Sequence, residues 1–421
     1  MKLKKIFVQF YSYDTLPRRY LWIDNKWKID DTKLMLLGNS FSHVYNECKE
    51  RGDIVWVRYD VGGTVDEVLS KNKNIPFPDP SVDIAYVSAF FVSNLNQVYL
   101  WSLSYPNIDF IVGGPAVRFI NPNSIPEVKN LRFSNLSLEE YFKFKEWNWK
   151  IDIPEENVKC SRISSAPINI QCYWNKCIFC SYNIKDEVDK SYFPSIESIS
   201  NLPKFNSPLT IHFNIPCLNK NMLHNLISLS EIDNESLLFG IFLRADDFII
   251  DEMERILPKM KNLHRFKIIV GLEFPSQRMI KVINKGITLE NYIRFSKLLE
   301  SYNIYTYSVC QFGWNNLIDE DVKEAEYWID RMSNKTIISL RQLTALHKSR
   351  LYNEDYFNEE RRHITVGKFY CGYVPILSKK QFDLNKAVVD LFFQKKMSRI
   401  IDTYSGGDHI NPSPYWNSSA L

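Results

Sequence analysis

Short apolar runs alternate with longer amphipathic stretches along most of this chain, and that alternation constrains the fold more than any other feature. In the first part of the chain we expect strands near residues 5–10, 54–59, 83–90, 109–113 and 131–133, with helices near 32–51, 64–71, 94–104 and 137–144. Strands that alternate with helices form a parallel sheet covered on both faces. Residues 1–149 are therefore predicted to fold as a flavodoxin-like, Rossmann-type α/β domain.

A second β/α series follows residues 150–166, which are polar, lack periodicity and are predicted to be a linker. Its strands are expected near 168–172, 209–214, 237–243, 266–272, 304–310 and 337–343. Apolar stripes predict helices between them, at 247–260 and at 289–302. Residues 167–345 thus predict a partial (β/α)6 barrel of the TIM type or an open parallel sheet. Residues 346–421 are expected to form a small helical extension with a helix near 386–404.

Composition and charge exclude several classes of protein. The net charge of +3 is too small for a nucleic-acid-binding surface, so no nucleic-acid partner is expected. No run of 18 apolar residues occurs, so no membrane span is expected either. The apolar run at the N-terminus is too short for a signal peptide, which predicts a cytoplasmic protein with reduced thiols.

Three of the eight cysteines lie within the segment QCYWNKCIFC, namely Cys172, Cys177 and Cys180. Thiolates bind iron–sulfur clusters or zinc. A structural zinc site needs four ligands, usually as two pairs, and the chain has no second CxxC, although Cys160 or His212 could complete such a site. Three cysteines suit a 4Fe-4S cluster with one open iron, which favours an enzyme over a zinc-binding, non-enzymatic protein. The other five cysteines are scattered singly and are interpreted as small buried residues.

The cysteine loop resembles that of radical S-adenosylmethionine (radical SAM) enzymes, whose common pattern is CxxxCxxC with an aromatic residue before the last cysteine. Phe179 occupies that aromatic position. The segment Arg244-Ala245-Asp246 is similar to the family's RAD segment, and residues 268–288, IIVGLEFPSQRMIKVINKGIT, are similar to its GLESGSQ…NKG block. The resemblance covers roughly residues 168–332.

One departure from the family pattern lies in the loop itself. Four residues separate Cys172 from Cys177, where the family usually has three. We therefore expect the cluster loop to leave the family's usual path.

The resemblance implies a role for each matching residue. Cys172, Cys177 and Cys180 would hold a 4Fe-4S cluster that cleaves S-adenosylmethionine reductively, with electrons from a reductant such as flavodoxin or ferredoxin. Arg244 and Lys285 would bind the carboxylate of S-adenosylmethionine, Glu273 would accept from its ammonium group, and Phe179 would lie near the adenine. From the residues alone, Arg244 and Lys285 could equally be solvated ends of elements, and Phe179 could serve only in packing.

The first 149 residues resemble the cobalamin-binding domain that precedes the radical domain in one subgroup. VSAFF (87–91) and IVGGP (111–115) fall at its two loop positions. There, the small residues Ser88, Gly113 and Gly114 would let the backbone approach a bulky ligand, although the two glycines could instead merely turn the chain. The DxHxxG motif of other cobalamin proteins is missing.

This subgroup implies cobalamin-dependent methyl transfer to an unactivated carbon of a peptide or small-molecule natural product. The alternative is a cobalamin-free radical SAM enzyme with a vestigial N-terminal domain. Such an enzyme would catalyse an epimerisation, a cross-link, a ring rearrangement or a dehydrogenation.

Overall fold

The computed structural model describes residues 4–14, 19–23, 26–30, 34–38, 55–64, 76–89, 92–114, 116–117, 120–134, 162–165, 172–180, 195–202, 204, 209–213, 217–347, 349–353, 361–366, 369–396 and 400–401. Residues 65–71, 137–144 and 168–171 lie outside these ranges, and with them two expected helices and most of one expected strand. None of the described helices has the length and apolar character needed to cross a bilayer.

Thirteen strands form one sheet that runs through both halves of the chain. The second half contributes β9 (Arg162–Ser165), β10 (Leu209–Phe213), β11 (Leu237–Leu243), β12 (Phe266–Glu273), β13 (Tyr305–Phe312) and β14 (Thr336–Gln342). These six strands pair in sequence order and all are parallel, and β18 (Ile400–Ile401) extends the row beyond β14. This is the six-strand parallel series expected of a partial barrel.

The first half contributes β1 (Lys4–Asp14), β5 (Val55–Thr64), β6 (Ile84–Ser88), β7 (Asp109–Gly113) and β8 (Leu131–Phe133). Their order across the sheet is β5-β1-β6-β7-β8, and every pair is parallel. Among the strands predicted from sequence, this is the order 2-1-3-4-5 of flavodoxin-like folds. The prediction for the N-terminal half is confirmed. Separately, β2 (Arg19–Ile23) and β3 (Lys26–Asp30) form a two-stranded antiparallel sheet.

Two strands lie where the sequence predicted other structure. β4 (Leu34–Gly38) falls within the expected helix 32–51, and β9 falls within the expected linker 150–166. β4 reads LMLLG, a continuous apolar run whose periodicity cannot distinguish a strand from a buried helix. β9 reads RISS, with one apolar residue, so it carries no hydrophobic signal and is held by backbone pairing to β4 and β10. Because β4 also pairs with β1, these two strands join the halves into one sheet.

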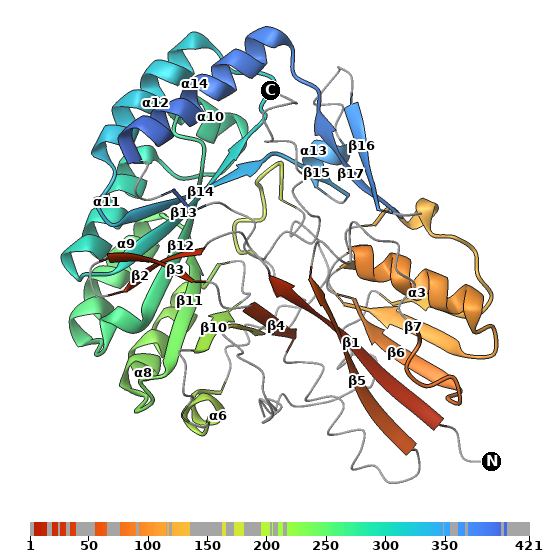
Figure 1. Ribbon diagram of the computed structural model, residues 1–421. Helices are drawn as coiled ribbons and strands as arrows, with labels where there is room; N and C mark the ends of the chain where they lie inside the picture. The colour runs from red at the N-terminus through yellow and green to blue at the C-terminus, as the bar shows by residue number, and fades with distance from the viewer. Residues whose placement is uncertain are drawn as a thin grey trace.

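Helices cover the outer face of the barrel strands (Figure 1). The longer ones are α9 (Asp247–Ile256), α11 (Leu289–Ser301), α12 (Asp319–Arg331) and α14 (Lys379–Lys396). Shorter ones are α6 (Ile196–Ser200), α7 (Lys220–Leu223), α8 (Asn225–Glu231) and α10 (Gln277–Val282), with 3-10 turns at Leu257–Lys259 and Leu263–Arg265. The first half contributes α3 (Val92–Ser104) and a 3-10 turn at Pro122–Ser124.

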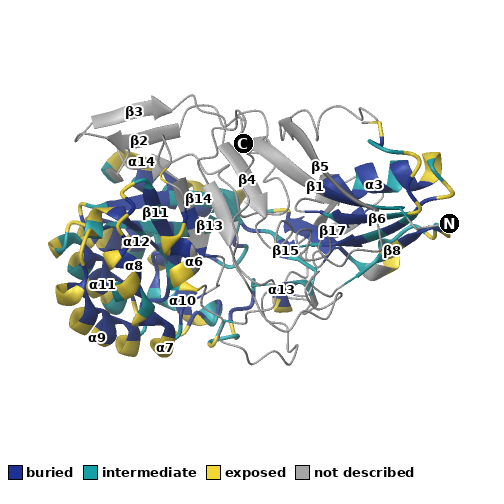
Figure 2. Ribbon diagram, turned by 90° about the horizontal axis from the view of Figure 1, so that it is seen from below, coloured by how far each residue is buried: buried dark blue, intermediate teal, exposed yellow. Residues whose placement is uncertain are grey.

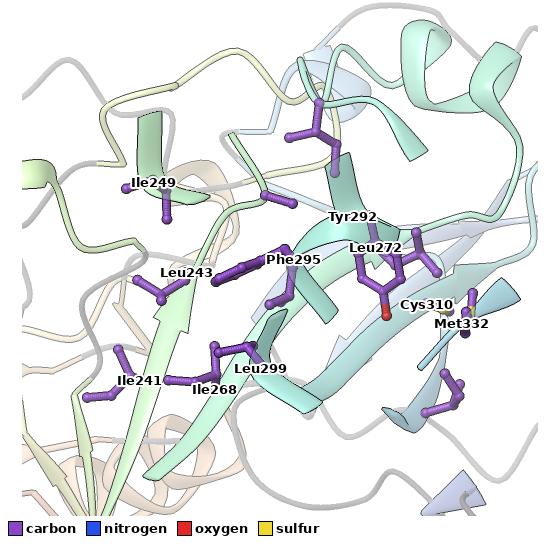
Figure 3. Packing of buried hydrophobic residues seen from close by; sticks show 14 of the residues in the cluster. Ile241, Leu243, Ile249, Ile268, Leu272, Tyr292, Phe295, Leu299, Cys310 and Met332 are labelled. Carbon is purple, nitrogen blue, oxygen red and sulfur yellow. The ribbon is translucent and has the colours of Figure 1, made fainter. Parts of the chain in front are cut away.

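Helix α11 illustrates why these segments form helices. Thr288 caps its N-terminus, because the Thr288 hydroxyl accepts a hydrogen bond from the backbone N–H of Asn291 at 3.1 Å. Phe295 and Leu299 lie one turn apart and are fully buried, so they form an apolar stripe against the sheet. Figure 3 shows these side chains gathered with those of the strands, and Figure 2 shows that the exposed residues lie on the outer turns.

The C-terminal part contains more strand than the expected helical extension. Helix α14 begins earlier than predicted and ends at Lys396, and Lys395 bridges to Glu326 and Asp330 of α12 at 3.1 and 2.8 Å. Before it, β15 (Ala345–Leu346), β17 (Phe369–Pro375) and β16 (Arg361–Val366) form an antiparallel sheet, with α13 (Arg350–Asn353) between β15 and β16. Two arginines open β16 and a glycine interrupts β17, so neither strand has a clean alternating pattern.

This small sheet fastens the N-terminal half to the barrel. Phe369 of β17 is fully buried within the apolar cluster of the N-terminal half. Its ring centroid lies 6.4 Å from that of Tyr99 and 5.9 Å from that of Phe133. The Asn121 side-chain amide also donates to the Tyr352 hydroxyl at 3.3 Å. We infer that β17 holds the two halves in a fixed relation.

Replacing Phe369 by alanine is expected to lower the free energy of unfolding by about 3–5 kcal/mol, because a fully buried ring is removed from the N-terminal core. Urea denaturation would measure the change. Phe393 of α14 is the matched control: it is 44% exposed, so Phe393→Ala should cost less than about 1 kcal/mol. Equal losses for the two variants would contradict an anchoring role for Phe369.

Candidate active site

The cysteine loop, residues 172–180, packs on the turn that follows α10. The backbone N–H of Ile178 donates to the carbonyl of Ile283 at 3.1 Å, and the backbone N–H of Leu351 in α13 donates to the carbonyl of Ile178 at 2.7 Å. Cys177 is buried, whereas Cys172 and Cys180 are half-buried. The loop is thus held between the barrel and the C-terminal part, with its thiols partly accessible.

The donor set of this loop fits a thiolate-bound cluster. Burial raises the pKa of the Cys177 thiol, while the positive charges of Lys285 and Arg244 act in the opposite direction. Both cations lie near Cys177, and each is paired with a carboxylate, Lys285 with Glu273 and Arg244 with Asp246. Within the described ranges, no three His, Cys, Asp or Glu side chains lie close enough to hold one metal ion. A 4Fe-4S cluster does not require such a group, because each thiolate binds a different iron.

The structure does not test whether Cys160 or His212 completes a zinc site. Cys160 lies outside the described residues, and so does the side chain of His212.

A buried ion pair stands at the end of β12. The Lys285 ammonium donates to Glu273 Oε1 at 2.6 Å, and the Gln311 amide donates to Glu273 Oε2 at 2.7 Å. Burial is the largest single influence on the pKa of Lys285 and lowers it, but the charge and hydrogen bond of Glu273 together with Cys177 leave the pKa raised. A Cβ at Gly271 would lie 2.2 Å from Glu273 Oε1 and 2.6 Å from Lys285 Nζ, so only glycine leaves room for this pair. Both oxygens of the carboxylate are therefore held in place.

Arg244 is bound on several sides. Its guanidinium donates to both oxygens of Asp246, at 2.8 and 3.0 Å, and to the backbone carbonyl of Lys285 at 2.7 Å. Tyr173 donates to the same carboxylate. The guanidinium also lies over two rings of the cysteine loop, 4.9 Å from Trp174 and 5.7 Å from Tyr173. Burial is the largest single influence on the pKa of Arg244 and lowers it, but the hydrogen bond and charge of Asp246, with smaller contributions from Tyr173 and Cys172, leave the pKa raised, so the group stays charged.

The structure brings Phe179, Arg244, Glu273 and Lys285 together beside the cysteine loop. Arg244 and Lys285 are 4% and 7% exposed, so neither is a solvated end of an element. Arg244 pairs with Asp246 and Lys285 pairs with Glu273, and the binding of a ligand carboxylate by either stays a prediction. The Phe179 ring lies 5.9 Å from Lys285 Nζ and packs edge-on against Trp314 at 6.4 Å.

The sequence interpretation missed one cysteine near this loop. Cys217 is 3% exposed, as expected of a buried residue; its thiol donates to the Leu218 carbonyl at 3.5 Å, and it lies near Cys172 and Tyr173 of the loop. Burial raises its pKa. A signal was present, because Cys217 follows the expected strand 209–214 and the carboxyl ends of parallel strands meet at one edge. Its single occurrence led to the interpretation of a simple buried residue.

The residues expected to contact cobalamin lie at the carboxyl edge of the N-terminal sheet. Ser88 ends β6 and Gly113 ends β7, and the two are paired in register. Gly114 has φ +98, and a Cβ there would lie 2.5 Å from the Ala89 carbonyl oxygen. The Ala89 N–H also donates to the Gly113 carbonyl at 2.9 Å. The close packing of the loop after β7 on the loop after β6 therefore explains why residue 114 is glycine. Flavodoxin-like folds bind their ligands at this carboxyl edge of the sheet.

Comparisons with known proteins support the architecture. No family model matches the chain, and a search of curated proteins finds no match. Solved structures do share the fold. The cobalamin-dependent S-adenosylmethionine radical enzyme OxsB, with aqua-cobalamin and S-adenosylmethionine bound, aligns with a TM-score of 0.59 and 14% identity over 92% of this chain and 66% of that chain. This chain thus spans slightly less than two thirds of OxsB.

The radical S-adenosylmethionine methyltransferase TsrM from Kitasatospora setae has the same fold over almost its full length. The structure with cobalamin and a [4Fe-4S] cluster aligns with a TM-score of 0.60 and 9% identity, over 96% of this chain and 94% of that chain. The structure with tryptophan substrate and the analogue aza-SAM gives 0.58 and 11%, over 97% and 93%. The predicted fold class, a flavodoxin-like half followed by a radical SAM-type barrel, is confirmed.

Proposed function

We propose that this chain is a radical S-adenosylmethionine enzyme that binds cobalamin and transfers a methyl group to an unactivated carbon of a peptide or small-molecule natural product. One observation carries the proposal: the loop 172–180, Arg244 and the Glu273–Lys285 pair converge at one end of a parallel barrel. The shared fold with OxsB and TsrM, which extends over more than nine tenths of this chain, supports it.

Cys172, Cys177 and Cys180 would hold a 4Fe-4S cluster, leaving one iron without a protein thiolate. When bound, the cluster and S-adenosylmethionine would supply a 5′-deoxyadenosyl radical. The protein contributes a half-buried loop, two ion pairs beside it in which Lys285 and Arg244 are the cations, and a fixed carboxylate. An electron carrier such as flavodoxin or ferredoxin would provide the electron. We propose the cytoplasm as the location, where such carriers are found.

Glu273 is the proposed acceptor for the ammonium group of S-adenosylmethionine. Lys285 and Gln311 each donate one hydrogen bond to the Glu273 carboxylate, one to each oxygen. Each oxygen can accept a second hydrogen bond, and a positively charged donor such as an ammonium group makes the strongest one. In this arrangement Lys285 orients Glu273, and Arg244 holds the backbone at Lys285. Phe179 would lie beside the adenine.

Cobalamin is proposed to bind at the edge formed by Ser88, Gly113 and Gly114. The flavodoxin-like strand order and the glycine-containing loop at that edge support this position. One observation favours the alternative, a cobalamin-free epimerase, cross-linking, ring-rearranging or dehydrogenating enzyme. The conformation of Gly114 is explained by its contact with Ala89 without any ligand.

Anaerobically reconstituted protein tests the proposal directly. We expect about four irons per chain, cobalamin absorbance, and both S-adenosylhomocysteine and 5′-deoxyadenosine on addition of S-adenosylmethionine and a reductant. Formation of 5′-deoxyadenosine without S-adenosylhomocysteine would support the cobalamin-free alternative. One zinc per chain with no iron would contradict both.

A single substitution separates the two cofactor sites. Ser88→Phe places a large ring between the ends of β6 and β7 and should remove bound cobalamin. Its iron content should equal that of the wild type, because Ser88 lies in the other half of the sheet. Cobalamin retained at the wild-type level would contradict the proposed binding edge.

A further inference from the structure

The enlarged stretch between Cys172 and Cys177 follows a defined path. Asn175 adopts φ 47, in the left-handed region, which few residues other than glycine and asparagine enter readily. This turn lies directly after Trp174, whose ring faces a second turn far along the chain, at residues 284–286.

Trp174 fills a space left by a glycine in that second turn. Its indole Nε1–H donates to the carbonyl of Asn284 at 2.7 Å. A Cβ at Gly286 would lie 1.9 Å from the Trp174 ring. Gly286 also has φ +73, so this position requires glycine both for its backbone and for the ring that occupies the space. The ring and the glycine are complementary in shape.

Arg244, from the segment after β11, contacts both Trp174 and the 284–286 turn. Its guanidinium carbon lies 4.9 Å from the centre of the Trp174 ring, within the range of a cation–π contact. The same guanidinium donates to the carbonyl of Lys285. Trp174 and Arg244 therefore bind two consecutive carbonyls, those of Asn284 and Lys285, and fix the backbone that carries the Lys285 side chain to Glu273.

We propose that Trp174 is a positioning residue, which docks the enlarged cysteine loop on the 284–286 turn and thereby couples the loop geometry to the Lys285–Glu273 pair. The inference rests on the proposed function for its consequence at the cluster. Trp174 is only half-buried and makes a directed hydrogen bond, so core packing alone does not account for its contacts.

The first test examines docking without any cofactor. Gly286→Ala should lower the urea midpoint of the apo protein strongly, and much less in a Trp174→Ala background, because only the backbone strain remains there. Gly313→Ala is the matched control: Gly313 has φ +109, but a Cβ there would meet only Leu343, at ordinary distances of 3.6 Å from its Cβ and 3.8 Å from its backbone N. Its shift should be the same in both backgrounds. A Gly286→Ala shift that is also the same in both would overturn the docking.

The second test examines the reconstituted cluster. Trp174→Ala should retain iron, shift the midpoint potential of the cluster and weaken S-adenosylmethionine binding by about 10- to 100-fold, as judged by the change it causes in the electron paramagnetic resonance spectrum of the reduced cluster. Trp174→Phe keeps an aromatic face toward Arg244 but loses the indole N–H and the part of the ring that meets Gly286, so it should recover only a part of both effects. Unchanged potential and affinity in Trp174→Ala would overturn the positioning role.

The two tests separate this inference from the proposed function. Wild-type protein that binds no iron would contradict the proposed function, yet the urea experiment on apo protein would still decide whether Trp174 docks the loop. Iron-loaded wild-type protein with an unaffected Trp174→Ala variant would contradict the inference alone.

Discussion

Replacing Cys177 by alanine is expected to abolish the iron–sulfur cluster and with it all cleavage of S-adenosylmethionine. Cys177 is the most buried of the three loop cysteines, and no thiolate at another position of the loop can replace it. Iron should fall from about four per chain to near zero, with loss of the brown absorbance. Metal analysis, absorbance and 5′-deoxyadenosine formation would measure the effect.

The matched control is Cys310→Ala. Cys310 is fully buried in β13, and burial raises its pKa well above the ordinary value, so it is expected to be an inert core thiol. The variant should lose some stability, on the order of 1 kcal/mol, and keep its iron. A full complement of iron in Cys177→Ala, or an equal loss in Cys310→Ala, would contradict the assignment of the cluster to this loop.

Replacing Lys285 by methionine should lower the free energy of unfolding by about 3–5 kcal/mol, because it leaves the Glu273 carboxylate buried without its cation. Adding Glu273→Gln to Lys285→Met removes the buried charge and should restore most of the stability. It should not restore cleavage of S-adenosylmethionine, since the proposed ammonium acceptor is gone. Urea denaturation and 5′-deoxyadenosine formation measure the two effects separately.

Lys395→Met provides the comparison for that experiment. Lys395 also pairs with carboxylates, those of Glu326 and Asp330, but both of these are about half-exposed. The loss should stay below about 1 kcal/mol. If Lys285→Met costs no more than Lys395→Met, the Glu273–Lys285 pair does not hold a buried charge. If the double variant cleaves S-adenosylmethionine normally, Glu273 is not the ammonium acceptor.

The parts of the fold predicted correctly share one property, which is a strong local pattern. The strands at Leu237–Leu243 and Asp109–Gly113 match the prediction residue for residue, and α11 begins at the predicted residue; Leu131–Phe133 also matches, although its pattern is weaker. The sequence did not predict β4 and β9 as strands, because β4 is a continuous apolar run and β9 has only one apolar residue. Neither pattern identifies a strand, and only pairing with neighbours decides it.

In the candidate site, too, the residues with a local sequence signal were predicted and their partners from other segments were not. Spacing and resemblance located the cysteines, Arg244, Glu273 and Lys285, and the structure places the last three beside the loop. Their partners did not follow from the sequence. Asp246 engages Arg244 and Gln311 holds one oxygen of Glu273, and neither neighbour was predicted, while the binding of a ligand by Arg244 and Glu273 stays a prediction.

The sequence alone determined the class of fold and the approximate bounds of most strands in both halves. These depend on periodicity and spacing over a few residues, which hydrophobic burial imposes locally. The tertiary structure alone decided the fit of Trp174 against Gly286, the proximity of Cys217 to Cys172, and the insertion of Phe369 into the other half. Each joins segments far apart in the chain, where only packing in three dimensions selects which side chains meet.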